Sequence, residues 1–467
     1  MVQSTLQMSG EEREKWIRQN RYYYTCLIQY LRFVIPSNAS ILEIGCGTGY
    51  LLEKLQPSRG VGIDSSKDMI EYARQHRGQY DYFHMDAEAL ELNETFDYVI
   101  ISDTIGYFGD VQKVFQEVQK VCSPQTRVII SYTNFFWLPL LRFAEIIGLK
   151  MPQKRQNWLD ISDIANLLTL ADFDVVRQTK KIIFPRYIPL VSWFLNKYVG
   201  NLPLFNFFGL VTFLVARSVK KPFKAAEDLT VSVVIPARNE KGNIEALVQR
   251  TPKMGKETEI IFVEGNSTDD TWGEIQRICQ KYQGQVPLKW IQQDGKGKGD
   301  AVRKGYSIAT GDVLMILDAD MTVPPEDLPK FFEAIATGKG EYINGTRLVY
   351  PMEKEAMRTL NLLGNKFFSI AFSWLLGQRL KDTLCGTKVM TRENYLKLAA
   401  NRSYFGDFDP FGDFDLIFGA AKLNLKFIEV PIRYRARTYG ETNISRFKHG
   451  WLLLKMTFFA LNKIKFL

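Results

Sequence analysis

The sequence predicts two α/β domains, each built around a mainly parallel β-sheet. With 467 residues, the chain is longer than one hydrophobic core normally supports. A short apolar strand that runs into a turn and a helix begins at Ile41, and a second such unit begins at Val231. Strand and helix patterns alternate after both starting points, which is typical of parallel α/β sheets.

The domain limits follow from changes in periodicity and charge. Residues 219–230 lose the strand and helix periodicity and mix charges of both signs, which marks a linker. The other segments are an N-terminal tail, a first domain, a second domain and a C-terminal apolar and basic segment. They cover residues 1–20, 21–218, 231–450 and 451–467, respectively.

Composition excludes several classes of protein. The five cysteines form no C-x-x-C pair and there are only three histidines, which argues for a reducing compartment and against structural zinc. The net charge of +9 favours an anionic partner, and basic residues concentrate in residues 433–450. Because no nucleic-acid-binding module accompanies them, we expect phosphorylated substrates or anionic lipid and no nucleic acid.

Two apolar segments are candidates for contact with a membrane. Residues 360–376 and 451–467 carry lysines and fall short of the roughly 20 apolar residues that span a bilayer. Both suit a helix at a membrane surface, and an ordinary core helix is the alternative. The first 16 residues are acidic and lack an apolar core, so we expect no secretory signal and a cytoplasmic location.

The first domain begins with a glycine turn suited to binding a nucleoside. The stretch EIGCGTG (43–49) follows a short strand and precedes a helix. Glycine lets the backbone approach a ligand, and a helix N-terminus offers unpaired N–H groups. Asp64 ends a second strand about 20 residues further on, where a carboxylate can bind ribose hydroxyls. The turn lacks the spacing of G-x-G-x-x-G, which argues against NAD, and a purely structural turn is the alternative.

These residues, with HMDAEAL (84–90) and FDYVIISDTIGYF (96–108), resemble the class I S-adenosylmethionine-dependent methyltransferases over about residues 20–218. The resemblance implies a Rossmann-like sheet that binds S-adenosyl-L-methionine. The implied cofactor-binding residues are Glu43, Gly45, Gly47, Gly49, Asp64, Asp86 and Ala87. The first four would surround the methionine part, Asp64 the ribose, and the last two the adenine. The methyl acceptor stays open, and a domain that binds the cofactor without catalysis is the alternative.

Polar groups gather at the predicted strand ends of the second domain, where open α/β sheets bind ligands. A cationic glycine loop that opens a helix (294–312) suits the charge of a phosphate. The candidate ligand-binding residues at the first three strand ends and in this loop are Pro236, Asn239, Glu240, Glu264, Ser267 and Lys298.

A further strand, DVLMILDAD (312–320), ends in Asp318 and Asp320. Alternation along a strand points both carboxylates to the same side, and like charges repel unless something compensates them. Carboxylate oxygens suit hard cations such as Mg²⁺ and Mn²⁺. The pair therefore predicts a metal site, and an ordinary strand end is the alternative.

The ordered strand-end motifs resemble the family 2 inverting glycosyltransferases, which have a nucleotide-diphospho-sugar (GT-A) fold and a D-x-D motif. Blocks at residues 344–347, 381–390 and 428–445 resemble the polyprenyl-phosphate branch typified by dolichyl-phosphate mannose synthase. This resemblance covers about residues 229–450. It implies that the residues named above, with Asp318 and Asp320, bind a nucleoside-diphosphate sugar and Mg²⁺ or Mn²⁺.

The implied chemistry assigns further roles. A metal held by Asp318 and Asp320 would stabilise the departing diphosphate, which makes Asp320 a catalytic candidate. An acceptor lipid phosphate is already ionised and needs cations to hold it, and Arg347 and Arg437 match the family's phosphate-contacting arginines. An acceptor hydroxyl would need a general base instead, for which Asp413 or Asp415 is the candidate.

The leading hypothesis is a bifunctional enzyme that methylates one substrate and transfers a sugar to a polyprenyl phosphate at the cytoplasmic face of the membrane. The alternative is a glycosyltransferase that acts on a soluble or glycan hydroxyl, with the first domain methylating the same glycan or only binding its cofactor. Glu264 and Gly265 replace a pair of aspartates of the family, and Thr322 replaces a metal-site glutamine. The sugar, the nucleobase and the oligomeric state stay open.

Overall fold

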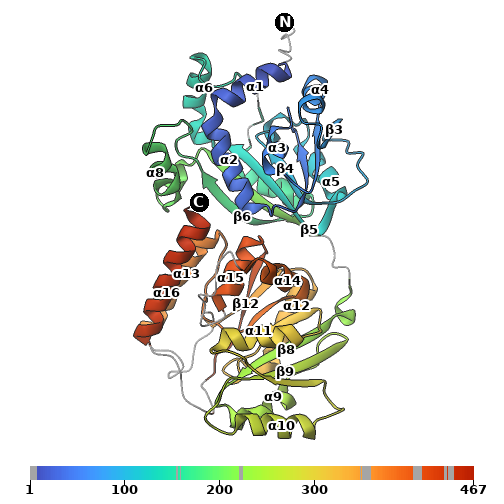
Figure 1. Cartoon of the computed structure of the whole chain (residues 1–467), viewed down its shortest axis with the longest axis vertical. Coiled ribbons are helices and arrows are strands. Elements are labelled where there is room, and N and C mark those ends of the chain that lie inside the picture. Colours follow the sequence, from blue (N-terminus) through green and yellow to red (C-terminus); the bar gives the residue numbers. More distant parts are fainter. Residues whose placement is uncertain are drawn as a thin grey trace. The chain divides into compact units, whose positions relative to one another are not determined.

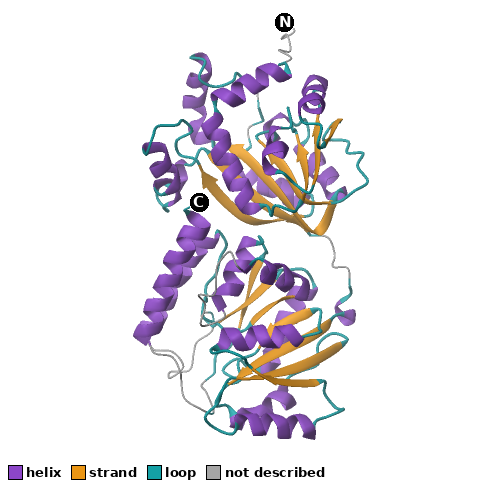
Figure 2. Ribbon diagram, in the orientation of Figure 1, coloured by secondary structure: helices purple, strands orange, loops and turns teal. Residues whose placement is uncertain are grey.

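The computed structural model of the protein describes residues 8–153, 156–157, 159–219, 224–347, 349, 359–402, 413–435, 439 and 446–466. The chain forms two compact units, Met1–Lys220 with Lys465–Leu467, and Lys221–Ile464. Each unit is a β-sheet covered by helices, as Figures 1 and 2 show. The prediction of two α/β domains is therefore confirmed.

The first unit contains a seven-stranded sheet in the order β3-β2-β1-β4-β5-β7-β6. Its strands are β1 (Ser40–Ile44), β2 (Arg59–Asp64), β3 (Asp81–His84), β4 (Phe96–Ser102), β5 (Cys122–Thr133), β6 (Phe173–Lys181) and β7 (Val211–Ser218). Strands β1 to β5 pair in parallel, and β7 is antiparallel to both of its neighbours. The carboxyl ends of β1 to β5 therefore meet at one edge of the sheet.

The described residues of the first unit form eight α-helices, several of which pack against this sheet. They are α1 (Gly10–Gln19), α2 (Arg21–Val34), α3 (Tyr50–Leu55), α4 (Lys67–His76), α5 (Val111–Lys120), α6 (Leu138–Ile146), α7 (Ile161–Leu170) and α8 (Val191–Lys197). The aliphatic side chains of β1, β2 and β4 are buried against α5, and each contributes about 1.5–3 kcal/mol.

Helix α1 corrects the prediction that residues 1–20 form a tail. A capping box between Ser9 and Glu12 starts this helix, since each side chain accepts a hydrogen bond from the other residue's backbone N–H. Glu14 then anchors the helix to the domain, because its Oε1 lies 3.0 Å from the Arg77 guanidinium and 2.6 Å from the Thr48 hydroxyl. The amphipathic pattern of this short helix is weak, and its partners lie far along the chain.

The second unit contains a seven-stranded sheet in the order β10-β9-β8-β11-β13-β12-β14. Its strands are β8 (Thr230–Ala237), β9 (Glu257–Glu264), β10 (Leu288–Gln292), β11 (Val313–Ile316), β12 (Tyr342–Thr346), β13 (Lys388–Thr391) and β14 (Phe427–Pro431). Only β13 is antiparallel to its neighbours among these strands. The start of β13 therefore lies at the edge where the other strands end.

The described residues of the second unit form α-helices, several of which pack against this sheet. They are α9 (Ile244–Arg250), α10 (Thr271–Lys281), α11 (Lys298–Ile308), α12 (Leu328–Ala336), α13 (Thr359–Leu376), α14 (Arg392–Ala400), α15 (Asp413–Lys422) and α16 (Arg446–Ala460). Helix α13 matches the predicted apolar segment 360–376, whereas α16 covers only the first ten residues of the predicted segment 451–467. Each helix has both buried and exposed apolar side chains. Within the described residues, no helix combines the length and the apolar composition that crossing a bilayer requires.

Candidate active sites

The turn between β1 and α3 needs glycine at three positions. Gly45, Gly47 and Gly49 have φ angles of +74°, +52° and +75°, in the left-handed region that other residues adopt only with strain. A Cβ atom on Gly45 would collide with Thr104, and one on Gly49 with Tyr82. A Cβ on Gly47 would meet no atom within 4 Å. Gly47 therefore borders open space, as a backbone that lies against a ligand must.

Asp64 holds this turn in place at the end of β2. Its Oδ2 accepts a hydrogen bond from the Gly47 N–H at 2.8 Å, and its Oδ1 accepts one from the Ser66 N–H at 2.8 Å. Each carboxylate oxygen has a second lone pair, so Asp64 keeps the capacity to bind a ligand hydroxyl. Burial raises the pKa of Asp64 above its ordinary value.

Asp86 and Ala87 lie beside Asp64, because the Met85 N–H donates to the Asp64 carbonyl at 3.1 Å. Asp86 is exposed and accepts a hydrogen bond from the Glu88 N–H at 2.9 Å, whereas Ala87 is buried. The structure thus brings the predicted ribose and adenine positions to one edge of the sheet.

Two carboxyl groups are buried near the same edge with an unsatisfied oxygen. Glu43 on β1 is 3% exposed, and its Oε2 has no hydrogen-bond partner among the described residues. Asp103 follows β4 and accepts a hydrogen bond from the Tyr23 hydroxyl at 2.7 Å, but its Oδ1 has no partner there either. Burial raises the pKa of both groups, to about 8 for Glu43. Unpaired buried oxygens are costly, so a ligand with cationic N–H donors, such as the ammonium of a methionine moiety, fits this site.

Glu43 should make the stability of the first unit depend on pH. Its pKa in the folded chain, about 8, lies above the ordinary value of 4.5, so the folded state binds more protons between these values. The free energy of unfolding should therefore fall as pH rises through this window, by at most about 1.4 kcal/mol per pH unit. Hydrogen exchange of β1 to β4 peptides from pH 5 to 8.5 measures this slope.

The Glu43→Gln variant should show a shallower slope, whereas the exposed Glu71→Gln should match the unmodified chain. Equal slopes in Glu43→Gln and the unmodified chain would contradict the protonation of Glu43 in the folded state.

In the second unit, the loops after β8 and β9 bond to each other. Glu264 accepts a hydrogen bond from the Ser267 N–H at 2.6 Å, and the Asn239 N–H donates to the Ser267 hydroxyl at 3.0 Å. Glu240 is buried, and its Oε2 accepts from the Asn243 amide at 2.7 Å, while Pro236 lies within β8. The predicted residues of these two loops therefore lie together. Glu240 stabilises the loop after β8 through its hydrogen bond with Asn243.

Asp318 forms an ion pair with Lys298, at 2.6 Å between Oδ1 and Nζ. A Cβ atom at Gly386 would collide with the same carboxylate, so the backbone before β13 closes over it. Burial alone would raise the pKa of Asp318, but Lys298, Lys388 and Arg347 outweigh it and lower that pKa. Asp318 therefore remains ionised beside a cation.

Asp320 accepts two hydrogen bonds through Oδ1, from the Thr322 N–H at 3.0 Å and the Thr322 hydroxyl at 2.8 Å. In the part of the chain that the structure describes, no three His, Cys, Asp or Glu side chains are grouped to hold a metal ion. Mg²⁺ is commonly bound by one or two carboxylates together with phosphate oxygens of the substrate. Asp318 and Asp320 fit that pattern and do not fit a metal site formed by protein ligands alone.

Arg347 follows β12 and forms a two-pronged ion pair with Asp382. Its Nε lies 2.7 Å from Oδ2 and its NH2 group lies 2.8 Å from Oδ1. Asp382 is fully buried, and the Arg347 guanidinium also lies 5.1 Å from the ring centre of Tyr434. The guanidinium that the sequence predicts to hold a phosphate is thus committed to a carboxylate that the sequence analysis did not identify.

Replacing Arg347 with alanine should therefore unfold the second unit more easily. Removing one partner of a buried ion pair leaves an uncompensated charge and costs about 3–5 kcal/mol. Urea unfolding followed by hydrogen exchange of β12 and β13 peptides measures the change. The exposed Arg435→Ala serves as the control and should leave stability within about 0.5 kcal/mol. If Arg347 only held a phosphate, its replacement would lower substrate affinity without this loss of stability.

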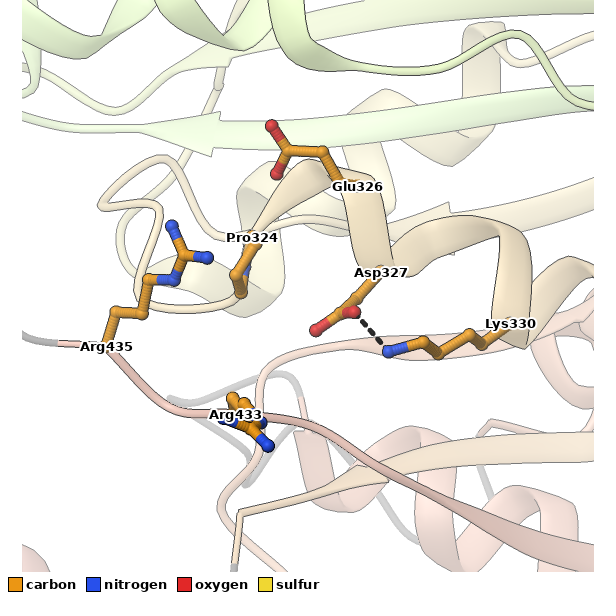
Figure 3. Close-up of a pocket in the computed structure, with 6 residues that line it drawn as sticks. All are labelled: Pro324, Glu326, Asp327, Lys330, Arg433 and Arg435. Carbon is orange, nitrogen blue, oxygen red and sulfur yellow. Dashed lines mark hydrogen bonds and ion pairs between the residues drawn. The ribbon is translucent and has the colours of Figure 1, made fainter. Parts of the chain in front are cut away.

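A cationic recess lies beside the loop that follows Asp320. This cavity of about 220 Å³ is lined by Pro324, Glu326, Asp327, Lys330, Arg433 and Arg435 (Figure 3). The Arg435 N–H donates to the Thr322 carbonyl at 3.0 Å, which places the recess next to Asp320. Asp327 pairs with Lys330, and Glu326 pairs with Arg250 at 2.8 Å. The residues that line the recess include three cationic side chains and two carboxylates, so their net charge is positive.

Sequence reasoning missed Arg433 and Arg435, although the alternating arginines of residues 433–437 carry the signal. Arg437 and the side chain of Asp413 lie outside the described residues. The nearby Asp415 is buried and pairs with Arg402 at 2.8 Å.

Each unit matches a known family model over part of its length. The family model described as "Methyltransferase domain" matches residues 16–178, and the one described as "Glycosyl transferase family 2" matches residues 232–397. The chain is 40% identical to a dolichol-phosphate mannosyltransferase of Pyrococcus furiosus over 124 residues. This match covers 26% of the chain and 34% of the relative. The chain thus spans only about a third of the length of this relative.

A second relative and a solved structure are also similar to parts of the chain. The chain is 28% identical to glycosyltransferase AglJ of Haloferax volcanii over 226 residues. This match covers 48% of the chain and 69% of the relative. A SAM-dependent methyltransferase structure from Thermotoga maritima covers 44% of the chain and 94% of its own, at 19% identity and a TM-score of 0.35. The two family models identify a methyltransferase domain followed by a family 2 glycosyltransferase domain.

Proposed function

We propose that the protein is a bifunctional enzyme. Its second unit would transfer a sugar from a nucleoside diphosphate to a polyprenyl phosphate, with inversion at the sugar carbon, and its first unit would transfer a methyl group from S-adenosylmethionine. The observation that carries the proposal is the sheet edge where Asp318, Asp320 and Lys298 lie next to the cationic recess. These groups supply both an anionic metal site and cations for phosphate.

The donor diphosphate would lie between Lys298 and the two aspartates. Lys298 is the first residue of α11, so its ammonium and the helix N-terminus both favour negative charge there. Mg²⁺ or Mn²⁺ bound by Asp318, Asp320 and the diphosphate would neutralise the charge that develops on the leaving group. The bonds between Thr322 and Asp320 fix the orientation of the second carboxylate.

The acceptor phosphate would bind in the cationic recess. Guanidinium groups bind phosphate with paired hydrogen bonds, and Arg433 and Arg435 come from the segment after β14, close to Asp320. A phosphate oxygen is already ionised, so attack on the sugar carbon needs no strong general base. The names of the relatives agree, since they include a dolichol-phosphate mannosyltransferase and an undecaprenyl-phosphate transferase.

In the first unit, methyl transfer needs mainly the alignment of the acceptor atom with the methyl carbon. Gly47 and Asp64 would hold the nucleoside, and the unsatisfied oxygens of Glu43 and Asp103 would face cationic parts of the cofactor or acceptor. The buried carboxyl groups thus support cofactor binding in addition to the glycine turn.

A thermal-shift panel of UDP-, GDP- and dTDP-sugars, with and without Mn²⁺, tests the glycosyltransferase proposal. A ligand at 100 times its Kd stabilises the folded state by about 2.7 kcal/mol, so one donor should raise Tm, and only with the metal. The same donor, labelled in the sugar, should then label polyprenyl phosphate. Labelling of a glycan hydroxyl alone, or equal shifts without metal, would contradict the proposal.

A further inference from the structure

The first unit exposes many large apolar side chains over α6 and residues 187–208. Ile146, Leu190 and Leu204 are 83%, 80% and 84% exposed, and Phe143 and Trp193 are also exposed. Isolated exposed apolar residues are normal, but contiguous ones mark an interaction surface. Figure 1 shows α6 and α8 on the same side of this unit.

Direct contacts join these segments into one surface. The ring of Phe136, just before α6, lies 5.2 Å from that of Phe208 and 5.8 Å from that of Phe207. The Trp137 indole N–H donates to the Phe208 carbonyl at 2.7 Å, and the Arg186 guanidinium donates to the Leu149 carbonyl at 3.1 Å. We name the surface formed by residues 136–149 and 187–208 the α6–α8 face.

The charges on and around this face are nearly all positive. Residues 182–208 contain two cations, Arg186 and Lys197, and no aspartate or glutamate. The single acid in residues 134–153 is Glu145, which is paired with Lys150. The Lys197 ammonium lies 5.8 Å from the Trp193 ring centre, so cationic and aromatic groups are interleaved.

We propose that the α6–α8 face lies on the surface of a bilayer that contains anionic lipid and holds the methyltransferase unit there. Aromatic side chains with neighbouring lysine and arginine suit the headgroup region, where apolar groups insert and cations meet lipid phosphates. A protein partner would more commonly be met by charges of both signs at the rim. Helices of the length of α6 and α8 are too short to cross the bilayer, so the face rests on it.

This proposal concerns the first unit alone and does not depend on the apolar helices α13 and α16 of the second unit. It implies that the methyl acceptor is presented at the lipid surface. That last step rests on the proposed methyltransferase activity, whereas the contact itself does not.

Flotation of the full chain with vesicles tests the proposal. The chain should float with phosphatidylcholine vesicles that contain 30 mol% phosphatidylglycerol, on the order of the anionic content that attracts cationic surfaces. The bound fraction should fall at least about tenfold in Ile146→Asp/Leu204→Asp, because two charges would enter the apolar layer. Leu170→Asp, which changes a side chain 55% exposed on α7, is the matched control and should float normally.

A conservative variant covers the case in which the double variant does not fold. Brominated lipid should quench tryptophan fluorescence of the unmodified chain, and Trp193→Phe should lose part of this quenching while Trp290→Phe should not. The proposal is overturned if the double variant floats as well as the unmodified chain, or if Trp193→Phe is quenched equally. The proposal is also overturned if the unmodified chain does not float with vesicles and the same substitutions instead dissociate a dimer, as measured by sedimentation velocity. Methyl transfer to a water-soluble acceptor is measured separately, without vesicles. It shows whether the proposed methyltransferase activity holds even when the membrane contact fails.

Discussion

Replacing Asp320 with alanine is expected to abolish sugar transfer and to leave methyl transfer unchanged. Asp320 is held by two hydrogen bonds from Thr322 at the sheet edge of the second unit, where it would bind the metal and diphosphate. Losing one electrostatic contact to a developing charge costs about 100- to 1,000-fold in rate, and losing the metal should cost at least as much. Initial rates with labelled sugar donor and labelled methyl donor measure both activities in one preparation.

The control for this substitution is Asp228→Asn, which removes an exposed carboxylate of the same unit. It should keep sugar transfer within about twofold, since surface substitutions rarely disturb a distant site. Sugar transfer by Asp320→Ala at the rate of the unmodified chain would disprove the metal assignment. Loss of both activities would instead indicate a general folding defect.

Replacing Gly47 with valine should remove binding of S-adenosylmethionine by at least about 100-fold. A β-branched residue at a φ of +52° is strained by roughly 1–2 kcal/mol, and its side chain would occupy the open space beside the turn. Relief of this strain by a change in the backbone would also disturb the hydrogen bond from the Gly47 N–H to Asp64. Equilibrium dialysis with radiolabelled cofactor measures the affinity.

Gly148→Val is a matched control, because Gly148 has a φ of +70° and a Cβ there would also meet no atom within 4 Å. Both variants should carry similar backbone strain, but only Gly47→Val should lose the cofactor. Equal losses in the two variants would show that strain in the unit, and no contact with a ligand, determines the binding.

The sheets were predictable because local patterns determine them. Apolar strands followed by turns and helices are legible over short stretches, and the left-handed glycines between β1 and α3 appear in the sequence as G-x-G-x-G. Asp318 and Asp320 stand out in the sequence as two acids after an aliphatic run. The expected strand over 312–320 was too long, however, because β11 ends at Ile316, so both acids lie in the loop after the strand and strand alternation does not relate them. Helix α1 was missed because its anchors, Arg77 and Thr48, lie far from it along the chain.

The ionic pairs of the second site could not be predicted in this way. Lys298 pairs with Asp318, and Arg347 pairs with Asp382, across 20 and 35 residues that include whole strands and helices. Sequence shows which side chains carry charge, but only the register of β11, β12 and β13 decides which charges meet. The role predicted for Arg347 was therefore incomplete, and the neighbouring Arg433 and Arg435 were overlooked.

The pairing of Lys298 with Asp318 also bears on the sequence in which substrates enter the second unit. The Lys298 ammonium already neutralises the charge of the Asp318 carboxylate. A free divalent cation would therefore have to displace this ammonium in order to bind. A nucleotide carries negatively charged phosphates. The Lys298 ammonium can pair with these phosphates instead, which leaves Asp318 available to bind the cation. The ion is thus expected to bind together with the nucleotide, as a metal–nucleotide chelate, and not as a free ion before it.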